Sequence, residues 1–445
     1  MQNSFRGGVH PNDKKTLSRA CPLRRFDPVG EMVFPVSQHI GKPAMPIVQK
    51  GDAVKVGQVI AEADGFVSAN VICSCSGTVK AVEKRRLISG TMGLCIVVDN
   101  DGQFTPVEGM GEMQDASAFS TAEIIDKIRA AGIVGLGGAG FPTHVKLKPA
   151  NPESIRFVIA NGAECEPYLT CNDRLMREQA VTVAAGLRIV LRLFPKAKGV
   201  VCIEDNKPEA IAAMRAAAGE NITVLALRTK YPQGGEHNII QTVAGVDYPV
   251  SKLPADVGCV VCNVGTLYAI ERALAYNEPL FSHVLTVTGE AVQEPKNLIV
   301  RDGTSFRELV EFCGGETGVK KVLSGGPMMG IAVGSLDVPV QKTTNGVTLL
   351  ADDPVEHAQE KMTACLHCGR CTTVCPAGLL PQLMADAAEM KDYERYEKTV
   401  YGLECVTCGS CTYVCPAKRP LTQIFKQAKA EIMLRKRAAQ AGGAK

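Results

Sequence analysis

The sequence predicts a multidomain α/β protein. Its 445 residues correspond to about two to four domains, at roughly 100–200 residues for each. The central part alternates apolar runs with helical patterns, and a cysteine motif near the C-terminus recurs after 40 residues. Hydrophobic residues make up 46% of the chain and charged residues 21%. This composition is typical of folded globular proteins and excludes a disordered chain.

The N-terminal residues 1–115 are predicted to form an all-β domain. They contain short runs rich in Val and Gly that are separated by turn residues, most clearly over 51–83. Such runs are typical of short strands joined by tight turns.

Residues 116–280 are predicted to form a parallel α/β domain. Helical patterns separate four strand candidates, and the longest of these patterns spans 171–194. The strand candidates are nearly continuous apolar runs, as expected for strands covered on both faces. Alternation of this kind favours a parallel sheet with helices packed against it. The four candidates are 156–161, 199–205, 223–228 and 258–264.

Three shorter segments complete the chain. Residues 281–345 combine strand signals with one helical stretch, which predicts a small α+β domain. Residues 346–430 are helix-prone and contain the cysteine repeat, and residues 431–445 form a basic tail. The tail could rest against anionic lipid or an acidic partner, or it could be a solvated helix.

Charge and cysteine content restrict the classes of function. The formal net charge is only +3, which argues against nucleic acid as a partner. The sequence contains no run of about 18 apolar residues, so no membrane-spanning helix is predicted. The N-terminus lacks the apolar core of a secretory signal, so we expect a cytoplasmic protein. In such a chain, 18 cysteines favour metal ligation over disulfides.

The repeated cysteine motif predicts two [4Fe-4S] clusters. Each copy reads C-x2-C-x2-C-x3-C-P, in which the first three thiolates hold one cluster and the fourth reaches the other. We expect one cluster to be bound by Cys365, Cys368, Cys371 and Cys415. We expect the other to be bound by Cys405, Cys408, Cys411 and Cys375.

Two alternatives for the motif are weaker. Zinc sites favour two separated C-x2-C pairs, and buried structural cysteines have no reason to recur in register. The ten other cysteines lack such a pattern, and we interpret them as small core residues.

A glycine-rich loop is the first candidate site for an organic cofactor. It satisfies G-x-G-x-x-G formally, but a helical pattern precedes it in place of a strand, so a dinucleotide fingerprint is rejected. Its bare backbone could approach a phosphate or a flat ring, although a plain turn is the simpler alternative. The loop contains Gly135, Gly137, Gly138 and Gly140 and is followed by Lys146.

Polar residues also follow the predicted strands. We expect them to converge at the carboxyl edge of the sheet, where ligands bind in open α/β folds. Carboxylates there would suit ribose hydroxyls, and amides would suit a flavin. They are Asn161, Glu164 and Glu166 after one strand, Gly234 and Glu236 in a later turn, and Asn263 and Thr266 after the last strand.

These segments resemble a known family. GLGGAGFPTHVK, NGAECEP, YPQGGEHN and CNVGT are similar, in order and spacing, to the FMN- and NADH-binding segments of the flavoprotein subunit of respiratory NADH dehydrogenase. FRGGVHPNDKKT, SCSGTV and the doubled ferredoxin motif resemble the C-subunit family of Rnf electron transport complexes. The resemblance covers nearly the whole chain.

The resemblance implies a fold for each domain and a role for each candidate residue. It implies an N-terminal barrel-sandwich (biotinyl-lipoyl-like) domain, an FMN/NADH domain, a β-grasp insert that is a soluble-ligand-binding domain, and a helical ferredoxin domain. Nicotinamide would stack near Phe141, with Glu166 and Glu236 toward its ribose, and Gly234 belongs to the same expected cofactor-binding set. Leu136 and Gly235 stand where the respiratory flavoprotein has Arg and Glu. FMN would contact Gly135, Gly137, Gly138, Phe141, Lys146, Asn161, Glu164, Asn263 and Thr266.

The implied function is electron transfer between NAD(H), FMN and two [4Fe-4S] clusters. The chain would be a peripheral subunit of a membrane-bound, ion-translocating ferredoxin:NAD+ oxidoreductase, on the cytoplasmic face of the membrane. Its partners would be membrane-embedded and ferredoxin-type subunits. No catalytic side chain is expected beyond the cofactor ligands. Two alternatives stay open: a soluble NADH-dependent reductase similar to a cobalamin reductase, and a scaffold with a degenerate flavin pocket.

Overall fold

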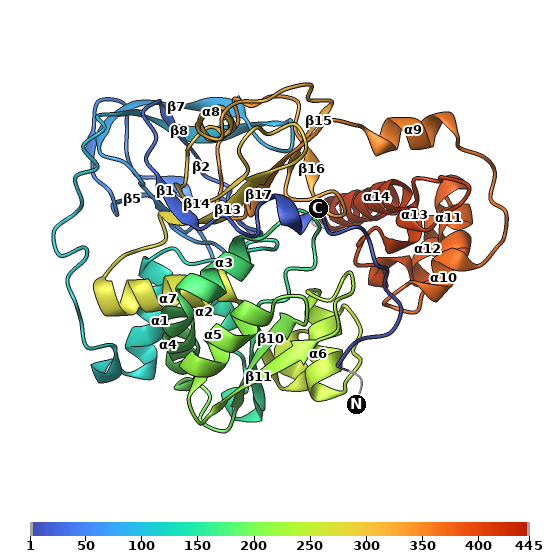
Figure 1. The fold of residues 1–445 in the computed structure, drawn as a ribbon, viewed down its shortest axis with the longest axis horizontal. Coiled ribbons are helices and arrows are strands. Elements are labelled where there is room, and N and C mark those ends of the chain that lie inside the picture. The colour runs from blue at the N-terminus through green and yellow to red at the C-terminus, as the bar shows by residue number, and fades with distance from the viewer. Residues whose placement is uncertain (1–2, 443–445) are drawn as a thin grey trace. The chain divides into compact units, whose positions relative to one another are not determined.

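The computed structural model describes residues 3–442, and these residues form two compact units (Figure 1). The larger unit comprises Asp13–Leu227 and Pro254–Asp352. The smaller unit comprises the described residues up to Asn12, Arg228–Leu253 and the described residues from Asp353 onward. The chain therefore enters the smaller unit three times, which the sequence patterns do not predict.

The N-terminal part of the larger unit is all-β, as predicted. Its strands pair antiparallel around a core that includes Phe34, Ile60 and Ile96. Cys73 and Cys75 are buried in the same core and act there as small apolar side chains. One sheet has the order β2 (Met32–Pro35), β8 (Met92–Asn100), β7 (Gly77–Arg86) and β4 (Ala53–Val54). The second sheet has the order β3 (Met45–Pro46), β5 (Val59–Glu62) and β6 (Val71–Ile72).

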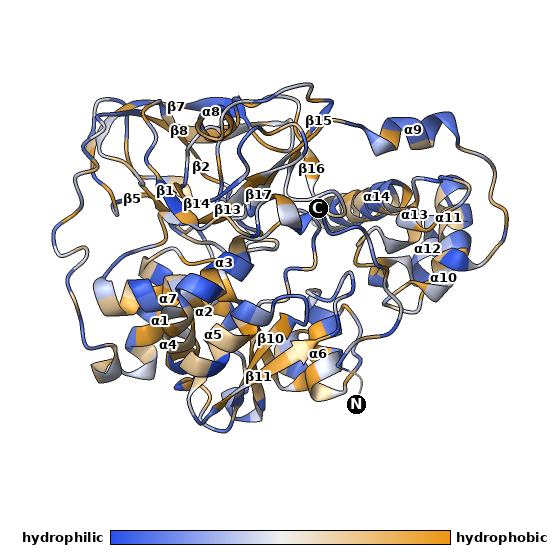
Figure 2. Ribbon diagram, in the orientation of Figure 1, coloured by the Kyte–Doolittle hydropathy of each residue, from blue (hydrophilic) through white to orange (hydrophobic). Residues whose placement is uncertain are grey.

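The α/β part contains the predicted parallel sheet. Its order is β11 (Ile222–Leu227), β10 (Lys198–Glu204), β9 (Phe157–Asn161) and β12 (Cys259–Asn263). All neighbouring pairs are parallel, and hydrophobic residues (orange) concentrate in these strands and the adjoining helices (Figure 2). The helices are α1 (Thr121–Ala130), α2 (Thr143–Lys146), α3 (Cys171–Glu178), α4 (Ala180–Leu191), α5 (Pro208–Ala218) and α7 (Val264–Tyr276).

The single helix predicted over 171–194 is wrong in one respect, because it is divided between α3 and α4. Gln179 separates the two helices with a backbone conformation that is not helical, at φ −129° and ψ 31°. The two helices share α5 and α7 as partners but differ in their other contacts. Helix α3 contacts the neighbouring β-sheet, and its Glu178 accepts the backbone N–H of Leu23. Helix α4 packs chiefly against α7.

A six-stranded mixed sheet forms the third part of the larger unit. Its order is β1 (Leu23–Phe26), β14 (Lys296–Arg301), β13 (Ser282–Thr288), β17 (Gly346–Leu350), β15 (Lys321–Ser324) and β16 (Ile331–Ala332), and α8 (Phe306–Phe312) accompanies it. Strand β1 comes from the predicted N-terminal domain but pairs with β14. Strand β17 is buried between β13 and β15, so the sheet extends beyond residue 345.

The smaller unit is helical, as predicted. Its core contains Met384, Tyr396 and Phe425. Within the described residues, no helix combines the length and hydrophobicity that crossing a bilayer requires. The helices are α6 (Glu236–Ala244), α9 (Pro354–Glu360), α10 (Arg370–Thr373), α11 (Pro381–Glu389), α12 (Tyr393–Lys398), α13 (Ser410–Tyr413) and α14 (Leu421–Gly442). Residues 443–445 of the predicted basic tail lie outside the described residues.

Candidate cofactor sites

The cysteine repeat is also a structural repeat. One glycine in each copy, Gly369 or Gly409, precedes a short helix, α10 or α13, and has a φ of 75° or 86°. His367 and Thr407 share a left-handed conformation, with φ values of 49° and 52°. Their N–H groups donate to the thiols of Cys365 and Cys405, each at 3.4 Å. Each copy therefore turns backbone N–H groups toward its own sulfur atoms.

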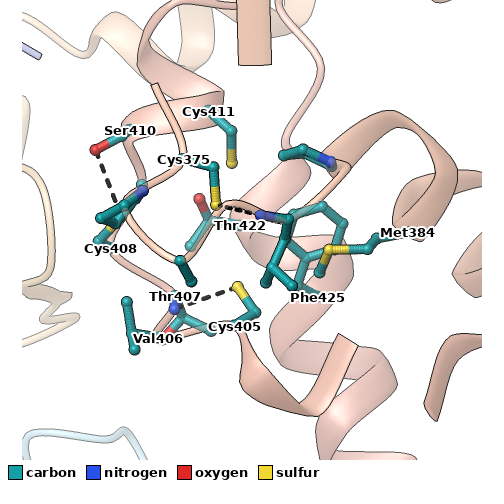
Figure 3. Close-up of a pocket in the computed structure, with 15 residues that line it drawn as sticks. Cys375, Met384, Cys405, Val406, Thr407, Cys408, Ser410, Cys411, Thr422 and Phe425 are labelled. Atoms are coloured by element: carbon teal, nitrogen blue, oxygen red, sulfur yellow. Dashed lines mark hydrogen bonds between the residues drawn. The ribbon is translucent and has the colours of Figure 1, made fainter. Parts of the chain in front are cut away.

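One pocket of the smaller unit is lined by cysteines from both copies of the motif. Figure 3 shows the sulfur atoms of Cys375, Cys405 and Cys411 turned toward the same space. Cys408 also lines it, together with the apolar side chains of Met384 and Phe425. These four cysteines are the ones predicted to bind the second cluster, in which Cys375 of the first motif joins three cysteines of the second motif. We call this arrangement crossed ligation. The donor set and the surrounding apolar wall fit an iron-sulfur cluster.

The thiols in this pocket influence one another electrostatically. Burial raises the pKa of Cys405 to about 11. The pKa of Cys411 is raised further, first by burial and then by the neighbouring Cys405, Cys408 and Cys375 thiols. A cluster binds thiolates, so its assembly must displace these protons.

The other predicted set differs from this one in a single member. Cys368 is exposed where Cys408 is buried, whereas Cys365, Cys371 and Cys415 are half-buried like the other three cysteines of the pocket. Arg419, four residues beyond Cys415, interacts with both Glu389 and the Cys365 thiol. The loop that carries Cys415 therefore adjoins the loop of the first motif.

The arrangement does not match a mononuclear metal site. Among residues 3–442, no three His, Cys, Asp or Glu side chains converge as the ligands of a single ion would. A zinc ion needs its ligand atoms within about 2.0–2.3 Å. A cubane holds its four thiolates around a larger body, which is consistent with thiols spaced around a pocket.

The order of the parallel sheet defines where a ligand would bind in the larger unit. The chain runs from β9 outward to β10 and β11 and then returns to β12 on the other side of β9. Such a reversal opens a crevice beyond the carboxyl ends of β9 and β12. Asn161 and Asn263 end those strands and are register partners. The structure thus brings these two predicted site residues together.

The glycine-rich loop is held against the same edge. The Leu136 N–H donates to the Thr266 hydroxyl at 2.9 Å, and Gly137 approaches the Asn263 amide so closely that a Cβ would lie 3.1 Å from its nitrogen. Gly137 also has a φ of 73°, which favours glycine. By contrast, a Cβ on exposed Gly138 would meet nothing within 4 Å. The loop therefore presents open backbone beside Asn263 and Thr266.

Lys146 and Gly135 shape the ends of this loop. The Lys146 ammonium donates to the Val261 carbonyl of β12 at 2.9 Å. The Gly135 N–H donates to the Phe141 carbonyl at 2.9 Å, which closes the loop into a compact turn. Five predicted residues, Gly135, Gly137, Lys146, Asn263 and Thr266, are thus connected to one edge of the sheet.

Two predicted acidic residues already have backbone partners. Glu164 accepts the N–H groups of Asn172 and Asp173 at 2.7 and 3.1 Å, so its carboxylate caps the first turn of α3. Through Oε1, Glu166 accepts the N–H groups of Met328 and Met329 at 2.6 and 3.2 Å. Burial raises the pKa of Glu166. Both residues therefore position the chain, whatever else they contact.

Two buried lysines that sequence patterns do not reveal support the loop that follows β9. Lys207 donates to the Ala163 carbonyl at 2.8 Å and pairs with buried Glu204 at 2.9 Å. Lys15 donates to the carbonyls of Glu166 and Leu169. The only sequence signal for Lys15 was its place in the FRGGVHPNDKKT segment, because the loop it supports lies about 150 residues away.

The remaining predicted residues, Gly234 and Glu236, belong to the smaller unit. Their loop begins at Tyr231, whose hydroxyl donates to the Cys408 carbonyl at 2.6 Å. The N-terminal segment adjoins the cysteine loop of the first motif. The Gly8 N–H donates to the Val374 carbonyl at 2.9 Å, and a Cβ on Gly7 would lie 2.8 Å from the Cys375 carbonyl oxygen. Sequence reasoning gave no role to these contacts.

Four family models match the chain. They are described as an RnfC barrel sandwich hybrid domain over residues 3–103, a Nuo51 FMN-binding domain over 128–272, an SLBB domain over 284–332 and a 4Fe-4S dicluster domain over 357–432. Together they confirm the predicted fold class of an N-terminal barrel sandwich, an α/β flavin domain, a β-grasp-type insert and a dicluster ferredoxin domain.

Two curated relatives match over nearly their whole length. A protein of Clostridium ljungdahlii, named as the C subunit of a proton-translocating ferredoxin:NAD(+) oxidoreductase complex, is 45% identical over 97% of this chain and 94% of its own. The Na(+)-translocating counterpart of Acetobacterium woodii is 42% identical over 98% of both chains. An NAD+-reducing [NiFe]-hydrogenase structure is 22% identical, with a TM-score of 0.50 over 65% of this chain and 56% of its own, and shows similarity of fold alone.

Proposed function

The chain belongs to the C-subunit family of ion-translocating ferredoxin:NAD(+) oxidoreductase complexes, and from this premise we propose how its residues carry out electron transfer. It is an electron-transfer subunit of such a complex, works with partner subunits and NAD(H), and uses FMN and two [4Fe-4S] clusters. The predicted family, activity, cofactors and partners are confirmed. The assignment of individual residues, of domain boundaries and of a membrane face is our proposal.

The residue assignment rests on one observation, which is that four cysteines from the two motifs line the same pocket. We assign Cys375, Cys405, Cys408 and Cys411 to one cluster, and Cys365, Cys368, Cys371 and Cys415 to the other. Thiolate ligation of every iron leaves no open coordination position, so the clusters supply one-electron transfer. The protein's part is to hold the thiolates apart at fixed positions and to place the apolar side chains of Met384 and Phe425 against one set.

The crevice between β9 and β12 is proposed as the flavin site. FMN supplies exchange between hydride and single electrons when it is bound. Exposed Gly138 offers close approach of backbone to a flat ring, and Asn161 and Asn263 offer amide groups at the strand ends. Glu164 keeps the adjoining α3 in place, and Glu166 retains Oε2 for a ribose hydroxyl. Gly234 and Glu236 stay predictions from the family resemblance.

Reconstitution tests the assignment of function. With both cofactors supplied, NADH is expected to reduce the clusters of the purified full chain, because hydride must be converted to single electrons before the clusters accept it. The measurement is cluster bleaching and reduced-cluster EPR after NADH addition, with and without FMN. Reduction that does not depend on FMN, or none with FMN bound, would contradict the proposal and favour the scaffold alternative.

We propose that the chain docks peripherally on the cytoplasmic face of the membrane. NAD(H) is a cytoplasmic carrier, and the exposed end of α14 bears Arg435, Lys436 and Arg437, which suits anionic lipid or an acidic partner. Protease added to inside-out vesicles that carry the complex is expected to digest the chain, whereas right-side-out vesicles protect it. Digestion only in right-side-out vesicles would place the chain on the opposite face.

A further inference from the structure

Tyr396 is a completely buried side chain whose polar atom has no protein partner. It lies in α12 with 0% relative exposure, and its hydroxyl finds no hydrogen-bond partner among the described residues. An unpaired buried O–H is costly, and buried tyrosines normally donate to some acceptor. The acceptor of Tyr396 is therefore expected to be a group that the polypeptide does not itself provide.

Tyr396 lies in a core that packs against two cysteines of the pocket. Its ring packs in the same core as Phe425, at 6.4 Å between centroids, and Cys405 and Cys411 pack against this core. Phe425 and both cysteines line the cysteine pocket. Gly402 makes room for the ring, because a Cβ there would overlap the ring atoms. Cys405 and Cys411 pack against this core. Among its described residues, the Tyr396 hydroxyl is the one buried donor that has no hydrogen-bond partner.

The first motif has no counterpart of Tyr396. The two copies of the motif are offset by 40 residues, so position 396 in α12 corresponds to position 356 in α9. Glu356 occupies that position. Glu356 is exposed, and α9 is largely hydrophilic (Figure 2). The two cluster sites are therefore chemically unequal although their cysteine spacing is identical.

We propose that the Tyr396 hydroxyl donates a hydrogen bond to a sulfur atom of the cluster held by Cys375, Cys405, Cys408 and Cys411, and so raises the reduction potential of that cluster alone. The inference rests on the proposed cluster assignment and adds a positioning residue to it. A tyrosine hydroxyl keeps its proton near neutral pH, so Tyr396 remains a donor.

The direction of the effect follows from charge. Reduction adds an electron to the cluster, so its sulfur atoms become stronger acceptors and the hydrogen bond stabilises the reduced state more than the oxidised state. Loss of the donor should lower the ratio of reduced to oxidised cluster about tenfold at a fixed potential. For a one-electron couple this corresponds to a shift of about 59 mV to lower potential.

The test compares Tyr396→Phe with Tyr393→Phe in the full reconstituted chain. Tyr393 lies on the same helix and packs half-buried at the edge of the same core, so its variant removes a hydroxyl and keeps the ring in place. EPR-monitored redox titration should show one cluster of Tyr396→Phe shifted to lower potential and the other unchanged. No shift in Tyr396→Phe, equal shifts of both clusters, or the same shift in Tyr393→Phe would overturn the proposal.

A second measurement does not depend on the variant. Resonance Raman Fe–S stretching bands of wild-type protein should shift on exchange into D2O, and this component should be missing in Tyr396→Phe. A wild-type spectrum without any such shift overturns the proposal even if the variant fails to fold. The iron content of wild-type protein distinguishes failure of the Tyr396 proposal from failure of the cluster assignment. Far fewer than about eight irons per chain would contradict the cluster assignment itself.

Discussion

Cys375→Ala is expected to remove the cluster of the second motif, although Cys375 belongs to the first. The protein should lose about four of about eight iron atoms, and NADH should no longer reduce the second cluster. The physical reason is that Cys375 lies in the same pocket as Cys405, Cys408 and Cys411. Removing one thiolate leaves an iron without its fourth ligand in an apolar pocket. Iron analysis and EPR of the reduced protein provide the measurement.

Double variants separate crossed from uncrossed ligation without spectral assignment. Crossed ligation predicts that Cys375→Ala with Cys405→Ala loses no more iron than Cys375→Ala alone, because both residues serve one cluster. Cys375→Ala combined with Cys365→Ala should lose both clusters. The reverse pattern would show that each motif binds its own cluster, and the proposed residue assignment would then be wrong.

Gly138→Ala is expected to weaken FMN binding by roughly 10- to 100-fold, since forced overlap in a packed contact costs about 1–3 kcal/mol. The free protein should be unaffected, because the new Cβ would meet nothing within 4 Å and the backbone φ at Gly138 does not lie in the left-handed region. Any loss of affinity therefore reports contact with the ligand. Fluorescence titration of FMN against apoprotein measures the affinity, and thermal unfolding checks the fold.

Gly140→Ala provides the matched control in the same loop. Gly140 is buried with a φ of 70°, and a Cβ there would lie 2.9 Å from the Thr343 side chain and 3.0 Å from the Gln38 carbonyl. This variant should lower the unfolding temperature, whereas Gly138→Ala should leave it unchanged. Unaltered FMN affinity in Gly138→Ala would show that the flavin does not lie over this face of the loop.

The predicted strands of the α/β domain illustrate how far local patterns reach. Each expected run agrees with β9, β10, β11 or β12 to within one residue at either end, because a strand covered on both faces requires apolar side chains along its whole length. The cysteine spacing is equally local, since one short loop must wrap around one cluster. The break between α3 and α4 was not predictable in this way, because it depends on what each helix packs against.

The sequence by itself determined the chemistry of this protein: which thiols are spaced to hold clusters, which runs become strands, and which glycines open a loop. These properties arise between residues close together in the chain. The tertiary structure alone decided that β1 joins the six-stranded sheet, that Gly7 reaches the loop of Cys375, and that Tyr396 is buried beside one cluster pocket and has no equivalent in the other motif. Such contacts join residues distant in sequence, and they depend on how whole elements fill space, which no local pattern records.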